Sequence, residues 1–210
     1  GRDRRAAPPA IAAMPLAVQP MEPVIRTHSA GQAAVLLLVL AAALIFWTSP
    51  TGGDFWWSDA PRHALNGVFV KDFLKELPLT NPVQWAIDWY LTWPAVTIFF
   101  YPPLYYALAA PFHMVLGEAH WVAQLPVALH YLSLGLGTYF LSRRWLPAFG
   151  AAGAALLVMG APAIAFWGRQ VMLDIPSVSY AVWATLLLCR WQDGGRDRLF
   201  WWAVVLLLAG

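Results

Sequence analysis

Long apolar runs separated by short polar segments dominate the pattern of this sequence. The runs cover residues 31–49, 120–142, 148–168 and 175–191, and a last one begins at Leu199. An α-helix needs about 20 mostly apolar residues to cross a bilayer. Because most of the runs reach or approach that length, the pattern predicts an all-α fold, a polytopic bundle of transmembrane helices.

The composition agrees with a membrane protein. Hydrophobic residues make up 60% of the 210 residues and charged residues only 11%, whereas a soluble domain carries roughly 25% charged residues. Mean hydropathy is +0.57. The net charge of +2 is small and the basic residues are dispersed, which argues against a nucleic acid partner. Cys189 is the single cysteine, so an intrachain disulfide is excluded.

The chain divides into four predicted parts. Residues 1–30 are rich in Ala, Pro and Arg without an apolar period, which predicts a disordered cytoplasmic tail. Residues 31–49 form the first transmembrane helix and residues 50–119 an outer loop with helices at the membrane interface. Residues 120–210 hold transmembrane helices two to five. The chain begins without Met and stops inside its last apolar run, so we expect an N-terminal fragment with a truncated fifth helix.

The apolar segment 102–117 decides the topology, because its length and its prolines fit a surface-lying helix better than a span. In that case nine basic residues share the side of the tail: Arg2, Arg4, Arg5, Arg26, Arg143, Arg144, Arg190, Arg196 and Arg198. Four lie opposite: Arg62, Lys71, Lys75 and Arg169. If the segment spans, the split becomes five against eight. Cytoplasmic loops carry the excess of Lys and Arg, so we expect the surface arrangement in an inner (plasma) membrane, with the N-terminus cytoplasmic.

Two Asp-x-Pro turns then open on the outer side, at Asp59-Ala60-Pro61 and at Asp174-Ile175-Pro176. Placing a carboxylate beside lipid costs free energy, so such a residue is a candidate for a functional role. Each acid has a structural interpretation as a helix N-cap, worth about 1 kcal/mol. The functional interpretation of Asp59 is a base that takes a proton from an attacking hydroxyl. Because both turns lie on one side in the expected topology, we expect them to converge on one cavity.

Other polar residues near the two turns are candidates for substrate binding. Arg62 and His63 share the face of Asp59 at helical spacing. Arg169 is either an interfacial residue or a clamp for a phosphate. The histidines show no HxxxH or HExxH spacing, so the metal ligands are unknown, and a divalent cation stays a candidate cofactor only.

The order of these motifs resembles the N-terminal half of the C-type polytopic glycosyltransferases. The nearest resemblance is to the bacterial family related to protein O-mannosyltransferases and to the aminoarabinose transferase of lipid A. It covers about residues 31–210 and is carried by Asp59-x-x-Arg62-His63-Ala64, Pro102-Pro103-Leu104-x-Tyr106, Leu125-Pro126, Arg143-Arg144 and Arg169-x-x-x-x-Asp174-x-Pro176.

The resemblance implies a function and a site. The donor would be a sugar on a polyprenyl phosphate, and the reaction would invert the anomeric configuration at the outer face of the membrane. Asp59 would be the base, and Asp174 would belong to the same pocket. The residues that bind substrate would be Arg62, His63, Tyr101, Pro102, Pro103 and Arg169.

Two departures from the family pattern concern this pocket. Ala60 replaces the second acid that often follows the first Asp, and Phe100-Tyr101 replace the charged residue that often precedes the Pro pair. Two rival interpretations stay open, a transporter or flippase for a lipid-linked substrate and a non-catalytic membrane scaffold. The sugar, the acceptor and the oligomeric state are not indicated by the residues.

Overall fold

The structure is a computed structural model that describes residues 28–98 and 100–209. The tail expected at residues 1–30 therefore lies outside the described residues, except for 28–30, which belong to the first helix.

The described part of the chain is all-α, without a strand, which confirms the predicted fold class. Its helices are α1 (His28–Trp47), α2 (Ala60–Glu76), α3 (Pro82–Thr92), α4 (Leu104–Leu116), α5 (His120–Ser142), α6 (Ala148–Met159), α7 (Pro162–Trp167), α8 (Asp174–Gln192) and α9 (Arg198–Ala209).

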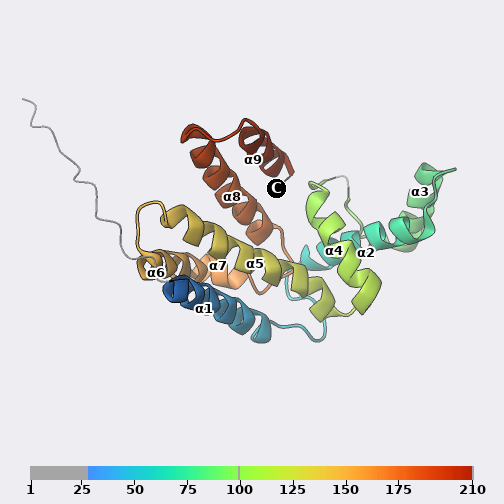
Figure 1. The fold of residues 1–210 in the computed structure, drawn as a ribbon. Coiled ribbons are helices and arrows are strands. Elements are labelled where there is room, and N and C mark those ends of the chain that lie inside the picture. Colours follow the sequence, from blue (N-terminus) through green and yellow to red (C-terminus); the bar gives the residue numbers. More distant parts are fainter. Residues whose placement is uncertain (1–27, 99, 210) are drawn as a thin grey trace, which may run out of the picture.

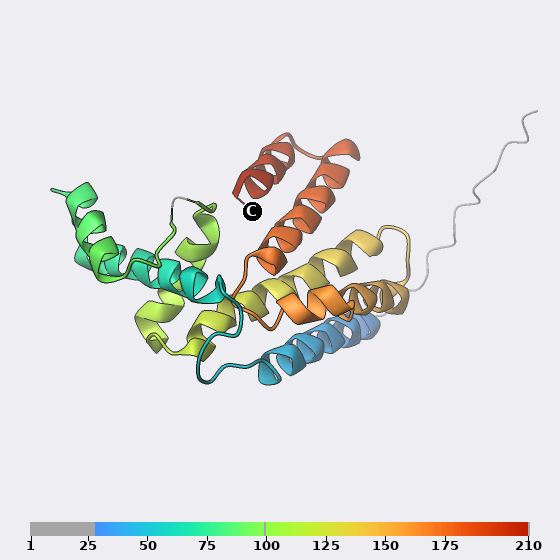
Figure 2. The ribbon, with the colours of Figure 1, turned by 180° about the vertical axis from the view of Figure 1, so that it is seen from behind.

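The long helix α5 is the centre of the fold (Figure 1). It packs against α1 and α6 on one side and against α8 on the other, and α9 packs on α8. Near the beginning of α5, α4 packs against it and α2 packs against α4. The helix α3 projects beyond α2 at the far end, which is also clear from behind in Figure 2. The fold thus joins a helical body to an outer arm made of α2, α3 and α4.

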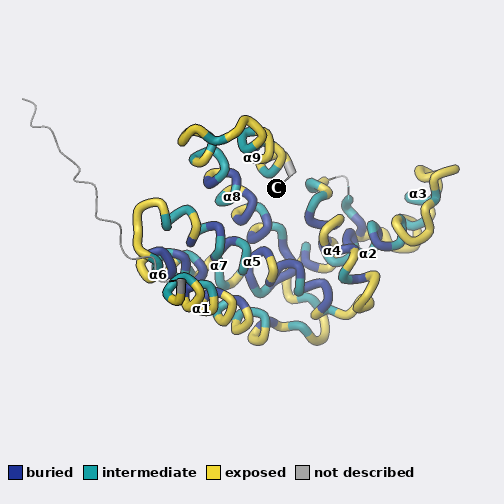
Figure 3. Tube along the Cα trace, viewed as in Figure 1, coloured by how far each residue is buried: buried dark blue, intermediate teal, exposed yellow. Residues whose placement is uncertain are grey.

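Small side chains let α1 and α6 approach each other and α5 closely. Ala34 and Leu38 of α1 and Ala151 and Ala155 of α6 are all fully buried. The buried stretches run along α5 and the faces turned toward it, whereas the outer faces of α1 and α9 are exposed (Figure 3). Exposed apolar faces of this kind are expected where lipid replaces water.

Among the described residues, α1 is the one helix that is long and apolar enough to cross a membrane, over Ser29–Trp47. Shorter apolar helices cover Leu104–Leu116, Ala148–Met159 and Arg198–Leu208. These features agree with a helical membrane protein.

The apolar run 148–168 does not form the single helix that the sequence pattern predicts. The helix α6 ends at Met159, and α7 begins at Pro162. Pro162 lacks an N–H and disfavours the helical conformation of the residue before it. Ala161 accordingly has φ −59° and ψ 133°, which is outside the helical region.

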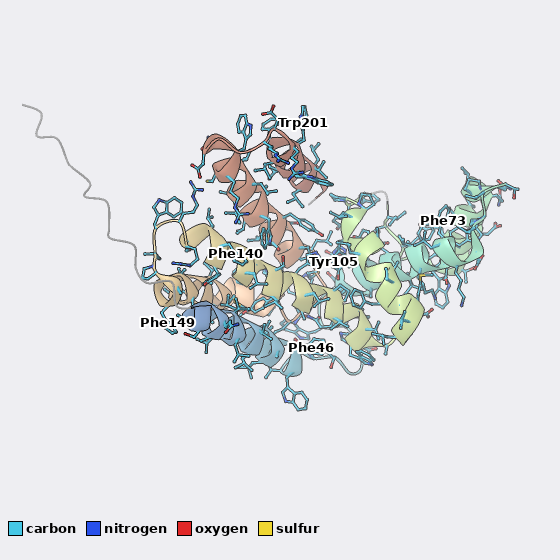
Figure 4. The ribbon with its side chains drawn as sticks, in the orientation of Figure 1. Phe46, Phe73, Tyr105, Phe140, Phe149 and Trp201 are labelled. Atoms are coloured by element: carbon cyan, nitrogen blue, oxygen red, sulfur yellow. The ribbon has the colours of Figure 1, made fainter. Side chains whose placement is uncertain are left out.

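The outer arm is held together by tryptophans. Trp85 and Trp89 of α3 pack on Phe69 of α2, with ring centroids 5.2 and 5.1 Å apart. The indole of Trp85 donates to Glu76 over 2.6 Å, and Phe73, labelled in Figure 4, lies 5.6 Å from the same ring. The opposite face of α3 exposes Val83, Ile87 and Leu91. An amphipathic helix of this kind suits the predicted position at the membrane interface, which stays a prediction.

Candidate functional site

The first Asp-x-Pro turn forms the beginning of α2. Asp59 precedes the helix, and its backbone carbonyl accepts the amide of His63 over 3.0 Å. Within the described residues, the Asp59 carboxylate makes no capping hydrogen bond to the first turn. It lies 3.8 Å from Nε of Arg62, and its side chain is 37% exposed. The interpretation of this carboxylate as a helix cap is therefore wrong.

The second Asp-x-Pro turn forms the beginning of α8. Asp174 is the first residue of that helix and is exposed, while Ile175 and Pro176 behind it are buried. The turn follows α7 through a short connector, residues 168–173. The amide of Gln124 on α5 donates to the carbonyl of Gly168 over 2.9 Å, and Gln124 is 1% exposed. A buried side chain of the central helix therefore anchors the connector that carries Asp174.

The two turns meet in the structure. Ala60, next to the first acid, belongs to the same buried cluster as Val171 and Met172, which lie just before the second. Ala123 of α5 completes this cluster, and Trp167 packs against it. Sequence reasoning expected the two turns to converge, and the packing brings them onto one side of α5.

The carboxylates of Asp59 and Asp174 both act on the imidazole of His63. Burial lowers the pKa of its imidazole below the usual value, while the carboxylates of Asp59 and Asp174 both oppose that shift and Arg62 adds to it. His63 is 2% exposed, and its Nδ1 lies 2.8 Å from the hydroxyl of Tyr106. The imidazole of His63 is therefore buried within electrostatic reach of both carboxylates.

The Tyr101-Pro102-Pro103 segment leads into α4, and its Tyr101 packs against His63. The ring of Tyr101 meets the imidazole edge-on, with centroids 4.8 Å apart. Pro103 caps α4, which begins at Leu104. The prolines therefore start a helix and bring Tyr101 to the site.

The two arginines lie in different surroundings. Arg62 is half-exposed beside Asp59. Arg169 donates to the backbone carbonyl of Thr48 at the end of α1, and its Nε is buried without a partner among the described residues. It lines a cavity of about 700 Å³. That cavity is also lined by Ile45, Thr48, Ser49, Pro50, Asp54, Trp56, Pro162, Ala165, Phe166 and Gln170, so neither Asp59 nor Asp174 contributes to it.

Sequence reasoning missed three buried polar residues around the site: Tyr106, Asn66 and Gln124. Tyr106 and Asn66 are both 0% exposed. Asn66 carried a signal, because it lies on the helical face of Asp59 and His63. Tyr106 carried a weaker one as the last residue of the Pro-Pro-Leu-x-Tyr motif.

Within residues 28–98 and 100–209, no group of three His, Cys, Asp or Glu side chains is placed to hold a metal ion.

The model of the family described as dolichyl-phosphate-mannose-protein mannosyltransferase matches residues 101–210. No curated protein and no solved structure matches the chain. The matched range contains Tyr101, Arg169 and Asp174 and begins after Asp59 and His63. Because the match covers more than half of the chain, this protein belongs to the dolichyl-phosphate-mannose-protein mannosyltransferase family, among the C-type membrane glycosyltransferases that its sequence resembles.

Proposed function

We propose that this protein transfers a sugar from a polyprenyl-phosphate donor to an acceptor hydroxyl at the outer face of the membrane. The observation that carries the proposal is the convergence of the two Asp-x-Pro turns, through Ala60, Val171 and Met172, in one buried cluster. Ionisable residues beside membrane spans are rare and are read by default as functional. Membership of a glycosyltransferase family supports the reaction class.

In the proposed reaction, the acceptor oxygen attacks the anomeric carbon of the sugar. The bond from that carbon to the phosphate oxygen breaks, and the lipid phosphate leaves with the electron pair. Asp59 takes the proton of the acceptor hydroxyl, which contributes roughly 10²–10⁴-fold. A single displacement of this kind inverts the configuration at the anomeric carbon.

The other charged groups have roles that follow from their positions. Asp174 stabilises the positive charge that develops on the sugar ring. The leaving phosphate needs positive charge, and Arg62 beside Asp59 is the candidate, whereas Arg169 donates to Thr48 in a cavity that neither acid lines. His63 and Tyr101 lie edge to face near Asp59, with ring centroids 4.8 Å apart, and are the candidates for the side of the site that faces the substrate.

The freedom of the Asp59 carboxylate from a capping bond supports its role as a base. A capping hydrogen bond would hold the carboxylate in its charged form and weaken it as a base. The nearest cation is Arg62, at 3.8 Å, and both side chains are partly exposed to solvent. The carboxylate can therefore accept a proton without breaking a bond on which α2 depends.

The test uses membranes that contain the full-length protein, supplied with a panel of polyprenyl-phosphate sugars. We expect Asp59→Asn to lose about 10²–10⁴-fold of transfer activity and to keep normal insertion and abundance. Asp174→Asn should also lose activity. Asp88→Asn is the matched control, because Asp88 is an exposed acid of the same loop that accepts from Gln84 over 2.8 Å. Wild-type transfer by Asp59→Asn in the presence of donor would refute the proposal.

A transporter for a lipid-linked substrate is the second candidate function. One observation favours it, since the break between Met159 and Pro162 gives a discontinuous helix of the kind that transporters use. The acids, however, lie at helix ends rather than in the middle of a span. Proteoliposomes with labelled donor distinguish the two functions, because an enzyme forms a glycosylated product and a transporter only moves the donor between leaflets.

A further inference from the structure

A series of buried and partly buried polar contacts runs from Thr97, in the loop before α4, to His63 on α2. The hydroxyl of Tyr106 lies 2.8 Å from Nδ1 of His63. The two rings are nearly parallel, at 17°. The side chain of Asn66 acts as a donor toward the Tyr106 hydroxyl and opposes the rise in the pKa of Tyr106, and Asn66 pairs with Thr97 through two hydrogen bonds. Thr97, Asn66 and Tyr106 thus form a path of polar groups that ends at the imidazole of His63.

One backbone group orients the side-chain amide of Asn66. The amide N–H of Thr97 donates to Oδ1 of Asn66 over 2.8 Å. The Asn66 side chain is therefore oriented with its NH₂ group toward the hydroxyls of Thr97 and Tyr106. Because Asn66 turns its NH₂ group rather than its carbonyl toward the Tyr106 oxygen, no acceptor on Asn66 competes for the hydroxyl hydrogen, which can be donated to Nδ1 of His63.

We propose that Tyr106 is a positioning residue that holds His63 as the neutral imidazole with its hydrogen on Nε2, beside Asp59 and Asp174. A neutral imidazole carries a hydrogen on one nitrogen only, so a donor at Nδ1 leaves the hydrogen on the other. Sequence motifs do not assign this role, because the periodicity of α4 does not show which residue of another helix a given tyrosine meets.

The effect of this arrangement on catalysis rests on the proposed function, in which Asp59 is the base. A positive imidazolium close to Asp59 would favour the carboxylate form and make Asp59 a weaker base. A neutral imidazole avoids that cost and still offers an Nε2–H donor. Tyr106 thus helps Asp59 to remain a stronger base without contacting the substrate itself.

Several charged or titratable groups from neighbouring elements act on His63. They are Asp59 just ahead of α2, Arg62 on α2, Asp174 on α8, Tyr106 on α4 and Tyr101 ahead of α4. Burial is the largest influence on the pKa of His63 and lowers it, whereas the two carboxylates raise it. The hydrogen bond from Tyr106 acts in the same direction as burial, because it stabilises the neutral ring.

The direct test is ¹⁵N NMR of the full-length protein in nanodiscs, with label in the histidines only. His63→Gln assigns the signal among the five histidines. The shifts of the two ring nitrogens report which one carries the hydrogen, and a pH series reports the pKa. We expect hydrogen on Nε2 in the wild type. In Tyr106→Phe we expect a mixture of tautomers and a pKa higher by about half a unit to one unit, as follows from losing one hydrogen bond to the neutral form.

Tyr105→Phe is the matched control. Tyr105 is the neighbouring residue on the same helix, is 3% exposed, and its hydroxyl has no hydrogen-bond partner among the described residues. It points to the junction of α4, α5 and α8, where it is labelled in Figure 4. Removing its hydroxyl should leave the His63 signals and pKa unchanged.

Two outcomes overturn the inference: a hydrogen on Nδ1 in the wild type, or His63 signals in Tyr106→Phe that match those of Tyr105→Phe. A second arm measures mannosyl transfer from polyprenyl-phosphate mannose against pH. We expect activity to fall on acidification as His63 becomes charged, and this fall should begin at higher pH in Tyr106→Phe. If the NMR result is as expected and no preparation transfers sugar, the proposed function fails and the role of Tyr106 stands.

Discussion

Replacement of Gly168 by Ala tests whether close packing holds the connector that carries Asp174. A Cβ at this position would lie 2.6 and 2.9 Å from Cδ2 and Cε2 of the Tyr131 ring. That ring cannot move freely, because Tyr131 is 2% exposed and its hydroxyl donates to the carbonyl of Met159 over 2.5 Å. If the connector moves instead, it loses the hydrogen bond from Gln124 to Gly168.

The expected loss of stability follows from these contacts. Overpacking costs about 1–3 kcal/mol, and the loss of one of the two hydrogen bonds adds about 0.5–1.5 kcal/mol. Replacing glycine recovers about 0.4–1 kcal/mol by restricting the unfolded chain. The free energy of unfolding should therefore fall by about 0.5–4 kcal/mol. Denaturant unfolding of the purified protein in detergent measures it.

Gly153→Ala is the control for the glycine substitution itself. No atom lies within 4 Å of a Cβ built at Gly153, which is inside α6. This variant should be as stable as the wild type or more stable by up to about 1 kcal/mol. In the double variant with Tyr131→Leu, the cost of Gly168→Ala should shrink by at least about 1 kcal/mol. If Gly168→Ala is as stable as Gly153→Ala, the packing argument for the connector is refuted.

Two further substitutions test the supports of the site. Gln124→Leu removes the hydrogen bond to Gly168 but also removes an Oε1 that is buried without a partner in the described chain, so stability should change by less than about 1 kcal/mol. Transfer activity should still fall by about tenfold or more as the connector shifts, and unchanged turnover would contradict this. Lys71 pairs with Glu118 and, over 2.8 Å, with Asp72. Burial lowers its pKa, but these hydrogen bonds outweigh burial and raise it, so the pair should stabilise the fold below the usual lysine pKa and weaken only above it. Lys71→Met should cost about 1–3 kcal/mol at pH 7 and Glu118→Gln less, and equal losses would contradict this assignment.

Much of the fold follows from apolar patterning alone. The run 120–142 coincides with α5 (His120–Ser142), and α8 (Asp174–Gln192) extends the run 175–191 by one residue at each end. The division of 148–168 into two helices was not predicted. Its signal was present in Pro162, whose effect on the preceding residue competes with the hydrophobic pattern.

The candidate site was predictable only in part. Asp59 and Asp174 stand out because charged residues are rare beside long apolar runs. Tyr106 and Gln124 do not stand out, since a polar residue within an apolar helix shows its partner only after the helices pack. Arg169 was expected near the acids, and its actual contacts with Thr48 and with the cavity at the end of α1 depend on the break after Met159.

Cysteine cross-linking between the two Asp-x-Pro turns tests the central claim, that they converge in one site. The pair Ala60→Cys and Met172→Cys, in a Cys189→Ala background of the full-length protein, places one thiol beside each turn in the shared buried cluster. A short thiol cross-linker in native membranes should join them efficiently. The pair Ala60→Cys and Trp145→Cys, with Trp145 in the loop between α5 and α6, should not react. No cross-link in the first pair, with both thiols shown to be reactive after unfolding, would contradict the account.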